Sequence, residues 1–265
     1  MAITPTDTLR YETEGRKAII TLTRPEAMNA LNREILNAIG EAIHEYEADD
    51  NLLVAIITGE GGRAFSVGAD LKEMTQRDQA EGVDDTDMGP GFNGFDDLDA
   101  CRKPLIAAVD GYCLAGGLEV TIYCDMVVAT EQSRFGLPEP RRSLLAGPGL
   151  HNLARIIPYR EAMMIQLTGG HMSSERAYDI GLIQRRVPDR DAMWAAAHEL
   201  ADEILECAPL AVQAIKRIVK TGRQLPVEYS EKLAEPIADF IATTEDRLEG
   251  PKAFAEKRAP NWKMR

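Results

Sequence analysis

Short apolar runs alternate with amphipathic stretches over the first half of the chain. Residues 11–22 contain a turn residue, Gly15, followed by alternating apolar positions, and this pattern predicts a β-hairpin. Residues 52–59, 104–111 and 125–130 are almost wholly apolar, which is typical of strands buried on both faces. Since helical stretches separate these strands, the pattern predicts stacked βαβ units and an α/β fold.

Helices are predicted both within this first half and throughout the remainder of the chain. Asn32 is a suitable cap for a helix that continues to about Tyr46, with apolar residues on one face. From residue 149 onward the chain is almost entirely helical in pattern, and residues 190–208 and 209–222 form the clearest helices. Residues 75–94 are acidic and rich in glycine, and they predict a mobile loop or a partly helical flap.

Composition and charge exclude several classes of protein. The formal net charge of −13 opposes binding to nucleic-acid phosphates. The four cysteines lack a C-x-x-C spacing and the four histidines do not form a ligand-like pair, so we expect neither a disulfide framework nor a metal site. No apolar run reaches the roughly 20 residues that a membrane span requires. The first ten residues lack the apolar centre of a secretory signal, and we expect a cytoplasmic protein.

A first candidate site is the stretch GYCLAGGLEV at residues 111–120. It follows a predicted buried strand, and the residues after its glycines can form a short helix. The N-terminus of such a helix has backbone N–H groups without partners, and glycine lets a ligand approach them closely. Glu119 falls in the first helical turn among apolar neighbours. The alternative is an ordinary glycine-rich turn whose carboxylate is stabilised by the helix dipole.

Two further segments have comparable features. Residues 62–74, GRAFSVGADLKEM, also join a predicted strand to a helix, and Ala69 can supply a second backbone N–H group; the alternative is an ordinary βα loop. Glu139 lies between two prolines in FGLPEP, and we expect a stiff, extended backbone there. The alternative for Glu139 is a solvated ion pair with Arg141 or Arg142.

The residue types in these three segments suit the chemistry of a thioester. Two backbone N–H groups can bind a thioester oxygen on which negative charge develops. Two carboxylates can divide the handling of a water molecule and a proton.

The three segments AFSVGADLKEM, GYCLAGGLE and FGLPE resemble the signature blocks of the enoyl-CoA hydratase/isomerase (crotonase) family. Their order and spacing match, and Glu139 follows Glu119 by twenty residues, as in the hydratases. The resemblance extends from the N-terminal hairpin through residues 23–32 to residues 253–258, which is nearly the whole chain.

This resemblance implies a fold and an assembly. We expect a crotonase-like spiral of repeated ββα units, with the CoA site and the active site, over residues 1–200. A helical C-terminal region over residues 201–265 is expected to pack on this core or on a neighbouring subunit. Members of the family usually assemble as homotrimers or as dimers of trimers, which are homohexamers.

The resemblance also implies roles for individual residues. The backbone N–H groups of Ala69 and Gly116 are expected to form the oxyanion hole, and Glu119 and Glu139 to be the acid–base pair. No cofactor is expected, because CoA is part of the substrate. The residues expected to bind the CoA thioester are Arg24, Ala27, Ala69, Asp70, Leu71, Gly116, Phe254 and Lys257. For the last two, the alternative is a solvated amphipathic helix.

Reversible hydration of 2-enoyl-CoA to 3-hydroxyacyl-CoA, as in fatty-acid β-oxidation, is the function that this resemblance favours. Double-bond isomerisation or carnitinyl-CoA-type dehydration on the same scaffold are alternatives. Leu118 replaces a glycine that many hydratases have, and we expect it to narrow or reshape the substrate pocket. RNA binding is opposed by the negative charge. A weakly active scaffold subunit of a β-oxidation complex is a further alternative.

Overall fold

The strands form two sheets. In each of the three candidate segments, the candidate residues come after a strand of the smaller sheet. A computed structural model describes residues 8–81 and 93–265. Within these residues, the larger sheet has the strand order β1-β2-β3-β5-β7-β10, with β1 and β2 antiparallel and the later neighbours parallel. Its strands are β1 (Leu9–Glu14), β2 (Lys17–Leu22), β3 (Val54–Gly59), β5 (Leu105–Val109), β7 (Met126–Thr130) and β10 (Arg185–Val187).

The smaller sheet consists of short strands that the apolar pattern did not predict. Its order is β4-β6-β8-β9, with β4, β6 and β8 parallel and β9 antiparallel to β8. These strands are β4 (Ala64–Ser66), β6 (Tyr112–Leu114), β8 (Arg134–Gly136) and β9 (His171–Ser173). Three residues are too few for a periodic pattern to be visible in a sequence.

The chain passes from the larger sheet to the smaller sheet and then to a helix, three times in succession. The first passage is β3, β4 and α2 (Leu71–Glu81), with α3 (Asn93–Ala100) beyond. The second is β5, β6 and α4 (Gly116–Tyr123). The third is β7, β8 and the 3-10 helix η3 (Glu139–Arg142), which leads to α5 (Pro148–Ile156). These are repeated ββα units, so the βαβ interpretation of the apolar pattern was incomplete.

The predicted strands and the first predicted helix are confirmed. The hairpin β1–β2 turns at Gly15, which has a φ of +60°. Asn32 caps α1 (Arg33–Ala48) by accepting a hydrogen bond from the Ile35 amide at 2.9 Å. The apolar face predicted for this helix is buried, and its five residues are Ile35, Leu36, Ile39, Ile43 and Tyr46.

Strand β3 separates two apolar layers, because alternate side chains point to opposite faces of a sheet. Ala55 and Ile57 belong to the main core together with α1 and α4, whereas Val54 and Ile56 pack with α8 (Arg190–Leu205). Leu118 is fully buried in the main core. Its effect on the shape of a substrate pocket stays a prediction.

Residues after 149 are mostly helical, as predicted, with the short strands β9 and β10 as interruptions. The helices between α5 and α8 are α6 (Tyr159–Thr168) and α7 (Ser174–Asp179), and a 3-10 helix, η1 (Pro25–Ala27), precedes α1. The predicted boundary at residue 200 lies inside α8, which packs on the larger sheet. The division into two regions stays a prediction.

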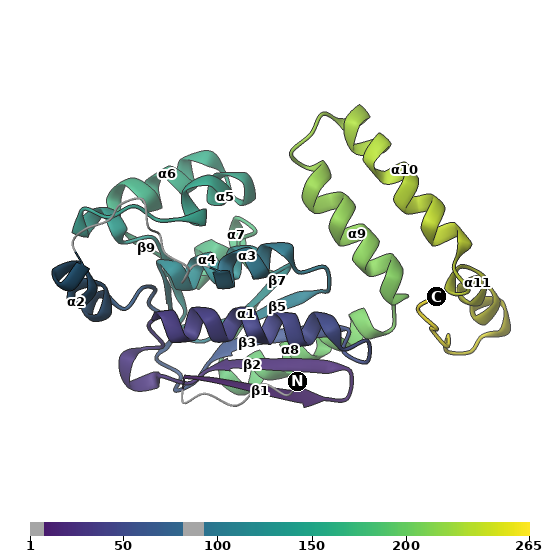
Figure 1. Cartoon of the computed structure of the whole chain (residues 1–265), viewed down its shortest axis with the longest axis horizontal. Coiled ribbons are helices and arrows are strands. Elements are labelled where there is room, and N and C mark those ends of the chain that lie inside the picture. Colours follow the sequence, from purple (N-terminus) through teal and green to yellow (C-terminus); the bar gives the residue numbers. More distant parts are fainter. Residues whose placement is uncertain (1–7, 82–92) are drawn as a thin grey trace.

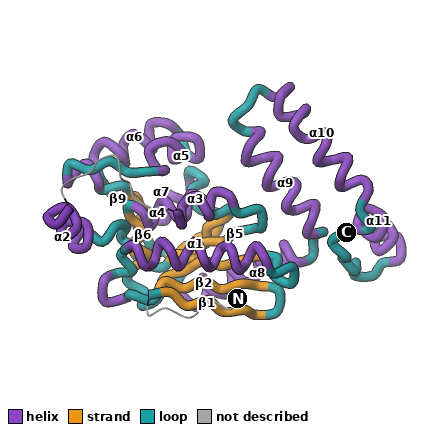
Figure 2. The backbone as a smooth tube through the Cα atoms, in the orientation of Figure 1, coloured by secondary structure: helices purple, strands orange, loops and turns teal. Residues whose placement is uncertain are grey.

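The last three helices form an arm that projects from the sheets (Figure 1). They are α9 (Pro209–Gly222), α10 (Val227–Thr243) and α11 (Asp246–Glu256), and Figure 2 shows the arm as helices and connecting loops without strands. Lys216 and Lys220 of α9 attach it to the core through ion pairs with Asp125 and Asp99, each at 2.7 Å.

Residues 82–92, which make up much of the predicted loop at 75–94, lie outside the described residues, as do residues 1–7 at the N-terminus. The flanking parts of the predicted loop belong to α2 and α3. Among the helices that are described, none has both the length and the apolar composition needed to cross a membrane.

Candidate active site

All three candidate segments follow the carboxyl ends of neighbouring parallel strands in the small sheet. Gly68 and Ala69 come after β4, Gly116 comes after β6, and Glu139 comes after β8. Parallel strands place their carboxyl ends at the same edge of a sheet, which is where ligands bind in many α/β proteins. The fold therefore brings together residues that are up to about seventy positions apart in the sequence.

The backbone N–H group of Ala69 points away from Leu31, with which Ala69 forms a parallel β-bridge. The Leu31 amide donates to the Gly68 carbonyl at 2.8 Å, and the Asp70 amide donates to the Leu31 carbonyl at 2.9 Å. In a parallel bridge of this kind, the central residue directs its own N–H and C=O to the opposite side. Ala69 is exposed, so its N–H can reach a ligand.

Gly116 begins α4, and a helix leaves its first N–H groups without intrahelical acceptors. The preceding residue, Ala115, has a φ of +52° and a ψ of −129°, a conformation that is unfavourable for a residue with a side chain. Such strain is often found at functional sites. The Cβ atoms that Gly116 and Gly117 lack would lie 3.0 Å from Leu31 Cδ1 and 2.4 Å from the Ser66 carbonyl oxygen, respectively.

Glu119 is almost completely buried, with 4% of its surface exposed, although it is a carboxylate. Its Oε1 accepts a hydrogen bond from the Gly149 amide at 2.8 Å. The pKa of Glu119 is raised to about 7; burial is the largest cause and the nearby Glu139 carboxylate adds to the rise, while the backbone amides of Gly149 and Gly147 oppose it. Glu119 therefore changes its protonation state near neutral pH, as a general acid or base requires.

Glu139 is half-buried, and burial raises its pKa as well, with Arg142 opposing the rise. Its Oε2 is buried and has no hydrogen-bond partner among the described residues. Unpaired carboxylate oxygens are costly to bury, and this one is suited to a water molecule or a substrate.

The backbone at Glu139 is not extended, so that prediction was wrong. Glu139 begins a 3-10 helix with Pro140 in its first turn, because the fixed φ of proline fits the start of a helix as well as an extended chain. The described residues show no ion pair between Glu139 and either arginine. The Arg141 Nε instead donates to the Thr168 carbonyl at 3.0 Å.

The N-terminal residues predicted to bind CoA lie together near this edge of the sheet. Arg24 forms an ion pair with Asp70 at 3.0 Å and donates from Nη1 to the Ala30 carbonyl, also at 3.0 Å. Ala27 ends the short helix η1, and Leu71, which begins α2, is 40% exposed. Arg24 and Asp70 thus form an ion pair next to Ala69, so the positive charge of Arg24 is already balanced by Asp70.

Phe254 and Lys257 are not close to the other predicted residues within one chain. Phe254 lies in α11 with 86% of its surface exposed, and Lys257 ends that helix. Figure 1 shows α11 at the opposite end of the molecule from α2, which begins at Leu71.

Three residues near the site were missed by the sequence analysis. Gly149 donates to Glu119, and the side chains of Leu31 and Phe95 flank the Cα of Gly116. The Gly147–Pro148–Gly149 sequence predicts the start of a helix. However, only the fold reveals that this helix start faces Glu119.

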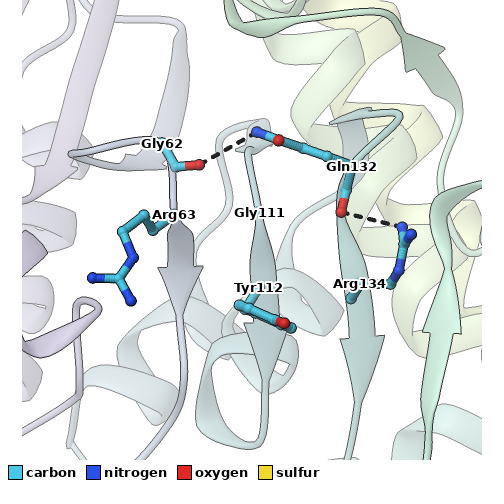
Figure 3. Close-up of a pocket in the computed structure, with 6 residues that line it drawn as sticks. All are labelled: Gly62, Arg63, Gly111, Tyr112, Gln132 and Arg134. Atoms are coloured by element: carbon cyan, nitrogen blue, oxygen red, sulfur yellow. Dashed lines mark hydrogen bonds between the residues drawn. The ribbon is translucent and has the colours of Figure 1, made fainter.

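A separate cavity lies at the amino ends of the same small strands (Figure 3). Its volume is about 330 Å³, and it is lined by Gly62, Arg63, Gly111, Tyr112, Gln132 and Arg134. Arg134 donates to the Ser133 carbonyl at 2.8 Å, and Gln132 donates to Gly62 and to Asp110. None of the predicted catalytic residues lines this cavity, so the candidate active site is at the other end of the strands.

Comparison with known proteins gives a consistent picture. The model of the enoyl-CoA hydratase/isomerase family matches residues 12–265. The enoyl-CoA hydratase EchA19 of Mycobacterium tuberculosis is 40% identical over 258 residues, 96% of each chain. A carnitinyl-CoA dehydratase of Salmonella typhi is 37% identical over 265 residues, 98% of this chain and 99% of its own.

Solved structures agree in fold over nearly the whole chain. An enoyl-CoA hydratase of Mycobacterium tuberculosis H37Rv has a TM-score of 0.88 at 38% identity, covering 98% of this chain and 100% of the other. An enoyl-CoA hydratase from Bacillus anthracis has a TM-score of 0.90 at 28% identity, covering 97% and 100%. The predicted fold class, including its helical C-terminal region, is confirmed.

Proposed function

Because the chain belongs to the enoyl-CoA hydratase/isomerase (crotonase) family, whose members act on acyl-CoA thioesters, we propose that it catalyses the reversible hydration of 2-enoyl-CoA to 3-hydroxyacyl-CoA. The strongest support is the environment of Glu119 and Glu139. Both carboxyl groups have raised pKa values, and the charge of Glu139 contributes to the raised pKa of Glu119. Glu139 follows a strand of the small sheet in which neighbouring parallel strands lead to Ala69 and Gly116. Paired carboxylates of this kind are suited to moving a water molecule and a proton in one step.

The thioester carbonyl binds between the N–H groups of Ala69 and Gly116. These donors withdraw electron density from the conjugated C2–C3 double bond and stabilise the enolate-like charge that develops during addition. Loss of one such donor costs about 3–4 kcal/mol of barrier in other enzymes.

Glu119 and Glu139 divide the proton transfers. Glu119 removes a proton from water as the water oxygen forms a bond to C3, and Glu139 gives its proton to C2. The step leaves Glu119 protonated and Glu139 ionised, and proton transfer between the two groups restores the starting state. The reverse sequence removes water from a 3-hydroxyacyl-CoA, and the chemistry needs no further cofactor.

Carnitinyl-CoA-type dehydration is the second candidate, favoured by the 37% identity to the Salmonella dehydratases over nearly the whole chain. Both reactions need the same carboxylate pair and differ in the acyl group. Isomerisation of a double bond requires proton transfer without water, and it does not explain why two carboxylates are retained.

The decisive experiment follows the absorbance of the conjugated enoyl thioester with short, long and cyclic 2-enoyl-CoA substrates and with crotonobetainyl-CoA. Wild type is compared with Glu119→Gln and Glu139→Gln. Turnover that both substitutions abolish supports hydration, and the preferred substrate distinguishes the two candidates. Isomerisation would replace hydration as the proposal if Glu119→Gln kept full activity while Glu139→Gln lost it.

The same proposal includes assembly into a homotrimer or a dimer of trimers. The arm has an apolar groove of about 250 Å³ between α9 and α10, lined by residues such as Ile215, Ile218, Ile237 and Ile241. None of the residues of α10 is buried in the single chain. A second copy that covers this surface would also bring Phe254 and Lys257 to a neighbouring active site, where Lys257 and Arg24 would face the CoA phosphates.

A further inference from the structure

Oε1 of Glu119 is held by a backbone amide at the start of a helix. Oε1 accepts the hydrogen bond of 2.8 Å from the Gly149 amide. Gly149 is the second residue of α5, where the backbone N–H groups have no acceptor within the helix. The start of α5 thus holds Oε1, and the Gly147 amide just before this helix also favours the ionised carboxylate.

The neighbouring side chains, and not the backbone, favour the absence of a side chain at position 149. Gly149 does not have the positive φ that favours glycine. A Cβ atom on Gly149 would lie 3.1 Å from Glu119 Oε1, 3.4 Å from Glu119 Cγ and 3.1 Å from Leu137 Cδ1. Because Glu119 and Leu137 are both buried, with 4% and 1% of their surfaces exposed, an added methyl group would press on the carboxylate as well as on the core.

We propose that Gly149 is a positioning residue: its amide anchors Oε1 of Glu119, and its missing side chain leaves that oxygen in place. This inference deepens the proposed hydration and rests on it. A carboxylate fixed at one oxygen presents the other to water in a single orientation. A displacement of about 1 Å can cost roughly 100-fold in rate, so the smaller displacement that a methyl group at position 149 imposes is expected to lower the rate by a smaller factor.

The test is Gly149→Ala, with His151→Ala as a control on an exposed position of the same helix. We expect kcat for hydration to fall by about 10-fold while KM for the enoyl-CoA changes little, because position 149 contacts Glu119 and is not among the residues proposed to bind CoA. Alanine inside a helix normally stabilises a protein, so the melting temperature gives an independent control. Unchanged kcat and pH profile in Gly149→Ala would overturn the proposal.

A double-mutant cycle shows whether Gly149 acts through Glu119. Gly149→Ala is combined with Glu119→Gln, and the residual rate of the double variant is expected to equal that of Glu119→Gln alone. Two independent losses that multiply would overturn the proposal. So would a Gly149→Ala chain that fails to fold whether or not Glu119 is replaced, since the glycine would then serve folding only.

A measurement without turnover separates this inference from the proposed reaction. The carboxyl stretch of Glu119 is followed by infrared difference spectroscopy during a pH titration, and Glu119→Gln identifies the band. In Gly149→Ala we expect the titration midpoint to move to higher pH, because the displaced carboxylate has a weaker hydrogen bond from the amide of residue 149, which favours the ionised form. An unmoved midpoint overturns the positioning role, whereas absence of wild-type turnover on every substrate overturns the proposed hydration alone.

Discussion

Gly68 packs directly against the amide of Gly116. A Cβ atom on Gly68 would lie 2.7 Å from the Gly116 nitrogen and 2.3 Å from the Ala115 Cβ. Gly68 also has a φ of +85°, which favours glycine over other residues. The turn after β4 and the turn after β6 therefore touch, and this contact places the two proposed oxyanion-hole amides side by side.

The first prediction concerns this contact. Gly68→Ala is expected to lower kcat by at least about 100-fold, because a side chain there separates the turns that carry the two amide donors. Gly181→Ala is the matched control, since Gly181 has a similar φ of +80° and no atom within 4 Å of its Cβ position. The control should lose about 1 kcal/mol of stability from backbone strain and keep its activity. Equal loss of activity in the two variants would contradict the role of the contact.

A second prediction is the pH dependence of the rate. Glu119 must be ionised to accept a proton from water, and its pKa is about 7. We therefore expect kcat/KM for hydration to rise with pH through about 7. The midpoint of this rise is a macroscopic value of the coupled pair, since the Glu139 carboxylate contributes to the raised pKa of Glu119.

Arg142 provides a test of the Glu139 environment. Arg142 lowers the pKa of Glu139, so Arg142→Gln should raise that pKa, as measured by an infrared titration of the Glu139 carboxyl group. Arg141→Gln, which removes the bond to the Thr168 carbonyl, should leave that pKa in place. Identical shifts in both variants would indicate a general effect of net charge.

The third prediction concerns stability. The pKa of Glu119 is raised from 4.5 to about 7 on folding. As pH increases, Glu119 therefore loses its proton in the unfolded chain before it does so in the folded protein. Relative to Glu119→Gln, the wild type should lose stability as pH rises from 4.5 through 7, by about 3 kcal/mol at pH 8. Urea unfolding at pH 5 and pH 8 measures the difference. Glu41→Gln, on an exposed position of α1, should change the free energy of unfolding by less than about 1 kcal/mol at both pH values.

The fourth prediction concerns the stability of Asp70 variants, because Asp70 forms an ion pair and also caps a helix. It pairs with Arg24 at 3.0 Å, and it accepts hydrogen bonds from the Lys72 and Glu73 amides at the start of α2. Asp70→Asn keeps the capping group and loses the ion pair, whereas Asp70→Ala loses both. We expect the alanine variant to be less stable than the asparagine variant by about 1 kcal/mol in thermal or urea unfolding. Equal stability of the two would show that the cap contributes nothing.

The long strands and the first helix could be predicted from the sequence because their apolar patterns are long and regular. Val54–Gly59 is buried along its whole length, and Asn32 caps α1 as its position indicated. The three-residue strands β4, β6 and β8 could not be predicted in this way. Their existence follows from tertiary pairing, and they determine where Ala69, Gly116 and Glu139 meet.

Side-chain environments were less predictable than residue identities. The order of the motifs pointed to Glu119 and Glu139, but the anchoring of Glu119 by Gly149 depends on a helix thirty positions later. The extended backbone expected at Glu139 was wrong because proline suits both an extended chain and a helix start.

The final prediction tests whether the arm of one chain completes the active site of another. One variant carries Glu139→Gln and an intact arm; the second carries Phe254→Ala and Lys257→Ala and intact carboxylates. Each should be weakly active alone. When the two are unfolded together and refolded, some sites combine an intact core with an intact arm from a neighbour, so activity should exceed the mean of the separately refolded variants. If Phe254 and Lys257 act within their own chain, mixing cannot restore a complete site, and the activity of the mixture will equal that mean.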